Sequence, residues 1–157
     1  MIDQPATDQY IILEQYKLYV EMTDNSSKRR LETNKFYISI LSGLLAILSF
    51  AAGKNQLSAE LQAPIIFAIA LLGIGLNFLW RTNIHAYRQL NAAKFKVISD
   101  LEHKLPFACY DVEWDYLGRG EEAKKYKPIS QVERYVPFFL VVPYLLLLGY
   151  SIYLFIP

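Results

Sequence analysis

Residues 64–80 read PIIFAIALLGIGLNFLW, an uncharged run of about 17 residues that is followed at once by Arg81. A helix rises about 1.5 Å per residue, so this run is close to the minimum that crosses a hydrocarbon core of roughly 30 Å. Residues 36–52 form a second run of about 17, and residues 136–156 form a third of about 21. Together with a hydrophobic fraction of 54%, these runs predict an integral membrane protein.

The predicted fold class is all-α. Its elements are an antiparallel transmembrane hairpin, a long cytoplasmic helical extension and a third, C-terminal membrane helix. Whether residues 136–156 cross the membrane or pack within an oligomer stays open at this stage. The expected organisation is an amphipathic arm over residues 1–33, the hairpin over 34–80, a helix and loop region over 81–134, and the last membrane helix over 135–157.

Lys and Arg are distributed unevenly along the chain. Five precede Phe36, one lies between the first two apolar runs, and ten fall between Arg81 and Arg134. Because basic residues near membrane ends stay on the cytoplasmic side, the N-terminus and residues 81–134 are expected in the cytoplasm, with the C-terminus outside. A secretion signal does not fit, since such signals begin with a short basic region and the segment before residue 36 is about 35 residues long and carries six acidic residues.

Several helix boundaries can be predicted from local signals. Residues 81–105 contain neither Gly nor Pro, so the second span should continue as a rod of about 35 Å until Pro106 ends it. Pro64 suits the first turn of that helix. Residues 25–27, Asn-Ser-Ser, could break the N-terminal arm into two helices. A short helix or turn is expected over residues 111–117, followed by a flexible loop that includes residues 121–127.

Small and polar side chains inside the apolar runs are candidates for helix packing. Small residues one turn apart let membrane helices approach closely, and an amide at that depth should face another helix rather than lipid. Asn91 is expected to make a polar contact at the base of the spans. The candidate packing residues are Ser39, Gly43, Gly73, Asn77 and Asn91.

Basic residues next to the apolar runs are expected to meet lipid headgroups, to which each contributes about 1 kcal/mol of attraction. The same basic residues could bind nucleic acid, but they lie beside predicted membrane boundaries, so attraction to lipid headgroups explains them more simply. Membrane lipids are therefore predicted partners and nucleic acid is not. The candidate interface residues are Arg29, Arg30, Lys35, Arg81 and Arg88.

Catalytic and metal-binding motifs are weak in this sequence. His85 and His103 lie 18 residues apart, and Cys109 is the only cysteine, so the spacing typical of metal ligands does not occur. The Gly73-Ile-Gly75 sequence lies inside an apolar run, where a nucleotide loop is not expected. We therefore expect no catalysis, no cofactor and no metal.

A series of short segments resembles the RipA-like family of small bacterial octameric membrane proteins. The segments are Tyr16-Lys-Leu-Tyr-Val20, Arg29-Arg30, Asn34, Phe36-Tyr37, Trp80-Arg81, Arg88-Gln-Leu-Asn91, Lys94-Phe95-Lys-Val-Ile98, Glu102, Leu105-Pro106 and Glu113-Trp114. The resemblance implies an octameric inner-membrane homo-oligomer with a cytoplasmic portion and no established catalytic chemistry. The first half is also similar to SLATT two-span effector modules, a likeness that implies a pore-forming role in bacterial defence. Both families are usually two-span, whereas residues 136–156 here indicate a third span.

These observations favour a homo-oligomeric scaffold or conduit in the bacterial inner membrane. The alternative is a membrane-anchored regulatory or binding module that captures a cytoplasmic protein or a soluble signal. A pore-forming effector of a defence system is a further alternative.

Overall fold

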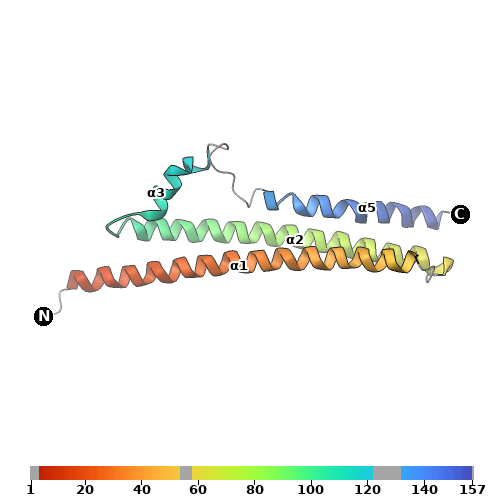
Figure 1. The fold of residues 1–157 in the computed structure, drawn as a ribbon, viewed down its shortest axis with the longest axis horizontal. Helices are drawn as coiled ribbons and strands as arrows, with labels where there is room; N and C mark the ends of the chain where they lie inside the picture. The colour runs from red at the N-terminus through yellow and green to blue at the C-terminus, as the bar shows by residue number, and fades with distance from the viewer. Residues whose placement is uncertain (1–3, 54–57, 122–131, 157) are drawn as a thin grey trace. The chain divides into compact units, whose positions relative to one another are not determined.

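The computed structural model describes residues 4–53, 58–121 and 132–156, and nearly all of them are helical. Two long helices come first, α1 (Gln4–Gly53) and α2 (Ala59–Glu102). The short helix α3 (Cys109–Tyr116) and a single 3₁₀ turn, η1 (Gly118–Gly120), follow, and α5 (Val136–Phe155) lies near the C-terminus. The described residues contain no strand, so the predicted all-α class is confirmed. Figure 1 shows the elements in chain order.

The chain divides into two compact units. The arm unit comprises Met1–Arg30 and Ala86–Gln131, and the apolar unit comprises Leu31–His85 and Val132–Pro157. Helices α1 and α2 contribute residues to both units, whereas α3 belongs to the arm unit and α5 to the apolar unit.

In the apolar unit, α1 and α2 form an antiparallel pair, and α5 lies against it (Figure 1). Phe67, early in α2, contacts Phe155 at the end of α5. Arg81, later in α2, contacts Phe138 near the start of α5. Helix α5 therefore runs antiparallel to α2. A small core joins the three helices. Its buried members are Tyr37, Leu41, Trp80, Ile84 and Tyr144.

In the arm unit, the first part of α1 pairs with the last part of α2. The Tyr16 hydroxyl donates to Glu102 over 2.9 Å, and the Ser26 hydroxyl donates to Asn91 over 3.1 Å, which fixes an antiparallel register. Helix α3 packs on α2 through an edge-to-face contact between aromatic rings, Phe95 with Tyr110, whose centroids lie 6.0 Å apart.

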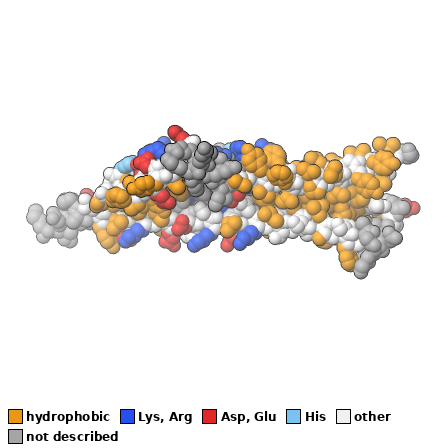
Figure 2. Space-filling view, turned by 45° about the horizontal axis from the view of Figure 1, so that its top comes forward, with side chains coloured by type: hydrophobic (Ala, Val, Ile, Leu, Met, Phe, Trp, Pro, Cys, Tyr) orange, Lys and Arg blue, Asp and Glu red, His pale blue; other side chains and the backbone are white. Residues whose placement is uncertain are grey.

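Three helices are long and apolar enough to cross a membrane, and their apolar windows fall in α1, α2 and α5. Most side chains in these windows are not buried within one chain, as expected where lipid or another protein surrounds a helix. On the face that Figure 2 shows, hydrophobic side chains cover the apolar unit, while Lys, Arg, Asp and Glu gather on the arm unit. Helix α5 is thus a third helix that is long and apolar enough to cross a membrane, as the sequence predicts.

Several local expectations were wrong. Residues 25–27 do not break α1, because the Ser26 hydroxyl is bonded to Asn91 and therefore does not compete for the helix backbone. Pro64 lies inside α2 rather than in its first turn, since the helix already begins at Ala59. The sequence predicts that α2 continues to Leu105, directly before Pro106. The helix instead ends three residues earlier, at Glu102. The predicted short helix over 111–117 is present as α3. The predicted loop over 121–127 lies almost wholly outside the described residues.

Candidate helix-packing and membrane-interface site

A polar and aromatic cluster joins α1 to α2 in the apolar unit. The Trp80 indole Nε1 donates to the side-chain oxygen of Asn34 over 2.8 Å, and both residues are buried. The Tyr37 ring stacks on the Trp80 ring with centroids 5.7 Å apart, and the Tyr37 hydroxyl accepts a 2.9 Å bond from the Asn83 amide. Each buried polar atom in these bonds therefore has a partner on the facing helix, which fixes how the two helices align.

Gly73 forms a notch on α2 that a tyrosine of α5 fills. A Cβ atom added at Gly73 would lie only 2.0 Å from Cδ1 of Tyr144. The Tyr144 hydroxyl donates to the backbone carbonyl of Leu41 on α1, and Tyr144 is fully buried. One side chain thus contacts all three helices, and glycine at position 73 is what makes room for it.

Asn77 is 3% exposed and lies one turn after Gly73. Its amide nitrogen donates to the Gly73 carbonyl over 2.9 Å, within its own helix, and its side-chain oxygen is buried without a hydrogen-bond partner among the described residues. Asn77 is therefore buried among the helices, but its bond does not link two of them.

Ser39 and Gly43 lie away from the helix contacts of their own chain. Ser39 is exposed, and a Cβ atom at Gly43 would meet nothing within 4 Å. The structure thus does not bring these two together with Gly73 and Asn77. Asn91 lies in the other unit, where its side-chain oxygen accepts the bond from Ser26.

The candidate basic residues are mostly exposed. Arg29, Lys35 and Arg88 are exposed, and Arg30 is half-buried. Arg81 is exposed too, and its guanidinium carbon lies 4.6 Å from the centroid of the Phe138 ring, within cation–π range. Arg81 directly follows the buried Trp80, so a positive charge lies at the end of the apolar run 64–80.

Glu102 is a buried carboxylate that the sequence did not single out as a site. It is 0% exposed, and its oxygens accept bonds from the Tyr16 hydroxyl and from the backbone N–H groups of Tyr110 and Asp111, at 2.9, 2.9 and 3.2 Å. The two N–H groups belong to the first turn of α3, where helix donors have no partner within the helix. Glu102 therefore caps α3 from outside that helix. Burial, together with Asp24, Glu113 and Glu102, raises the pKa of Tyr110 above its ordinary range.

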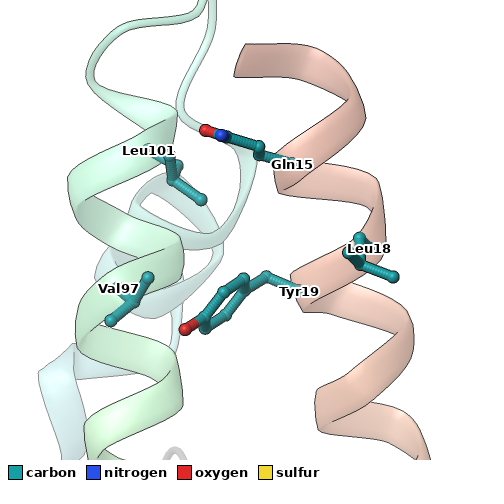
Figure 3. Close-up of a pocket in the computed structure, with 5 residues that line it drawn as sticks. All are labelled: Gln15, Leu18, Tyr19, Val97 and Leu101. Atoms are coloured by element: carbon teal, nitrogen blue, oxygen red, sulfur yellow. The ribbon is translucent and has the colours of Figure 1, made fainter. Parts of the chain in front are cut away.

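A groove of about 270 Å³ lies between α1 and α2 in the arm unit. Figure 3 shows Gln15 and Tyr19 reaching from α1 toward α2, with Val97 and Leu101 on the facing helix and Leu18 at the side. The ammonium of Lys94 lies 5.8 Å from the centroid of the Tyr19 ring. The groove is mainly apolar and carries a cation nearby.

Metal-ligating side chains do not gather in the described part of the chain: no group of three His, Cys, Asp or Glu residues there could hold an ion.

The fold and the contacts above define a membrane protein built from three apolar helices and a charged helical unit. Residues 13–153 match the model of the octameric membrane protein family (8xMP), so the chain belongs to that family. Neither curated proteins nor solved structures gave a match.

Proposed function

We propose that this chain forms a homo-oligomer, an octamer, in the bacterial inner membrane and acts there as a scaffold or conduit without catalysis. The family description names an octamer, which supports self-association. The uneven distribution of Lys and Arg supports a cytoplasmic N-terminus and arm unit. The exposed basic residues beside the spans would meet anionic lipid headgroups.

The observation that carries the proposal is a difference between the outer surfaces of the apolar unit. On α1, Ser39, Ser42 and Ser49 are exposed, and they share one face at helical spacing. The buried residues of α1, Tyr37 and Leu41 among them, lie on the other side of the helix. The outward surface of α1 within its apolar segment therefore carries a strip of serine hydroxyls beside large exposed side chains, among them Phe36, Ile47 and Phe50.

The apolar segments of α2 and α5 also expose large apolar side chains, but no serine is exposed in residues 60–81 or 136–155. Phe78 is 69% exposed, Phe139 76% and Leu146 69%. Large apolar side chains suit contact with lipid, whereas small and hydroxyl-bearing faces suit close helix packing or a polar passage. In an oligomer we therefore assign α2 and α5 to the lipid side, and α1 to subunit contacts and the wall of a conduit.

Substitution at Gly43 tests this assignment in liposomes. Gly43→Leu would place a large side chain one turn from Ser39, at the edge of the serine strip, and abolish ion flux or dissociate the oligomer. Gly149→Leu is the matched control, because a Cβ atom at either glycine meets nothing within 4 Å but Gly149 lies on α5. If the purified oligomer conducts no ions at any voltage or with any ligand, the conduit role is excluded and the scaffold role remains.

Topology can be measured separately. A reporter fused after the last residue should be found outside the cytoplasm, because three crossings place the two ends of the chain on opposite sides. Cytoplasmic reporter activity would contradict the three-span arrangement. Native mass measurement of the detergent-extracted particle gives the number of subunits.

A further inference from the structure

The groove in the arm unit is an apolar surface that its own chain leaves open. Leu18 is 56% exposed and Val97 36%, although both line the groove. Figure 3 shows Gln15 and Tyr19 of α1 pointing across it toward α2, while Leu18, at the rim, points away from α2. Burial of another apolar side chain in this groove removes apolar surface from water and would stabilise the bound state.

Helix α3 lies on another side of the same unit. It contacts α2 through Phe95, two residues before Val97. Successive residues on a helix are about 100° apart, so Phe95 and Val97 point in directions about 160° to 200° apart. The groove and α3 therefore occupy different sides of the arm unit.

The outward face of α3 carries an exposed aromatic residue and an exposed carboxylate. Cys109, Glu113 and Tyr116 share one face at spacings of four and three, and all three are exposed. Tyr116 is 80% exposed. Tyr110, whose ring contacts Phe95 of α2, lies about 100° around α3 from Cys109.

We propose that the α3 face of one copy docks on the groove of the next copy, with Tyr116 entering the groove and Glu113 opposite Lys94. This inference rests on the proposed homo-oligomer and specifies one of its subunit contacts. The charges are complementary, since Lys94 stands over the Tyr19 ring at the groove and Glu113 lies one turn from Tyr116. Tyrosine is a favoured anchor at protein interfaces because one end of it is apolar and the other can form a hydrogen bond.

The two surfaces differ, so the contact is head to tail rather than symmetric. Such contacts join each subunit to two neighbours and produce a ring when the rotation closes. A closed ring of eight copies is compatible with this geometry, whereas a symmetric contact would stop at a dimer.

Cys109 is the only cysteine of the chain, which allows a direct crosslinking test of the full-length protein in membranes. Leu18→Cys places a second thiol at the groove rim. A short bis-maleimide should then join Leu18→Cys of one copy to Cys109 of its neighbour and give a ladder that extends beyond the dimer. Adding Cys109→Ser should remove the ladder.

Ala92→Cys is the matched control, because Ala92 is exposed on α2 but points away from Val97 and Leu101. It should give no ladder. Lys94→Glu should lower the crosslinking yield of Leu18→Cys about fivefold, the size expected for one exposed ion pair. Glu113→Lys added to Lys94→Glu should restore it.

Native mass measurement distinguishes the docking of α3 on the groove from the homo-oligomer on which it rests. An oligomer of full mass without the ladder, or a ladder of equal yield from Ala92→Cys, would overturn the docking of α3 on the groove and leave the homo-oligomer intact. A particle that is monomeric in mass would overturn the proposed homo-oligomer as well.

Discussion

The Trp80 indole donates its single hydrogen bond to Asn34, and neither side chain is accessible to solvent beyond a few per cent. The two residues are 46 positions apart and join α1 to α2. An unpaired donor or acceptor at such a site costs about 1–3 kcal/mol. The pair therefore fixes the alignment of the hairpin as well as adding to its stability.

Trp80→Phe should lower the thermal stability of the detergent-extracted protein, because it leaves the Asn34 oxygen buried without its partner. The expected loss is about 1–3 kcal/mol. Trp80→Phe combined with Asn34→Leu removes both polar groups and should recover part of the loss. Circular dichroism at rising temperature measures both effects. If the double variant is as unstable as the sum of the single ones, the bond is not the cause.

Gly73→Ala should destabilise the packing of α5, since its Cβ atom would overlap the Tyr144 ring. Overpacking of this kind typically costs about 1–3 kcal/mol. Gly75→Ala is the matched control, because a Cβ atom there meets nothing within 4 Å. Thermal unfolding should separate the two variants, and Tyr144→Ala should suppress the effect of Gly73→Ala. Equal melting temperatures for the two alanine variants would contradict the notch.

Asn77→Leu should leave stability unchanged or raise it. The Asn77 amide bonds only to its own helix, and its oxygen is buried without a partner in the described residues, so an apolar side chain of similar size removes an uncompensated polar atom. The measurement is the melting temperature of the oligomer in detergent. A clear fall in that temperature would show that the Asn77 oxygen binds a group of another subunit.

Glu102→Gln should loosen α3 from the arm unit. The substitution removes the charge that accepts two backbone N–H groups of the first turn of α3, and half of the new amide is a donor. Hydrogen exchange at Tyr110 and Asp111 should become faster. Asp100→Asn, at an exposed position of the same helix, serves as the control. Unchanged exchange at these two amides would mean that the cap does not hold α3.

Alkaline pH should weaken the arm unit through Tyr110. Its pKa is raised in the folded protein, mainly by burial, so above about pH 10 the unfolded state loses the phenol proton while the folded state keeps it. The contribution of Tyr110 to stability is complete below that pH and declines as pH rises toward the folded-state pKa. Tyr110→Phe should make the decline shallower, as followed by denaturant unfolding between pH 9 and about 12. An identical slope in both proteins would contradict it.

The membrane helices could be predicted from the sequence because the constraint that produces them is local. A bilayer of fixed thickness demands about 20 apolar residues in a row, and residues 36–52, 64–80 and 136–156 satisfy or approach that demand on their own. The continuity of α2 beyond residue 80 could be predicted for a similar reason, since nothing in the next stretch interrupts a helix.

The pairings between helices could not be predicted, because they depend on register. Trp80 marks the end of an apolar run and Asn34 is part of a family resemblance, but nothing local indicates that the two residues meet. Asn77 was expected to face another helix, and it is buried, but the structure gives it a partner in its own backbone. Glu102 was missed as a site because a single carboxylate at the end of a helix is ordinary until α3 folds back onto it.

The notch at Gly73 also restricts motion. Sliding α5 along α2 by one helical turn, about 5.4 Å, would require the Tyr144 ring to leave its recess and its hydroxyl to release the Leu41 carbonyl at the same moment. Small axial shifts, which many membrane proteins use as a gating stroke, are therefore blocked between these two helices. Within the apolar unit, α5 is therefore expected to move together with the facing parts of α1 and α2 rather than to slide past them.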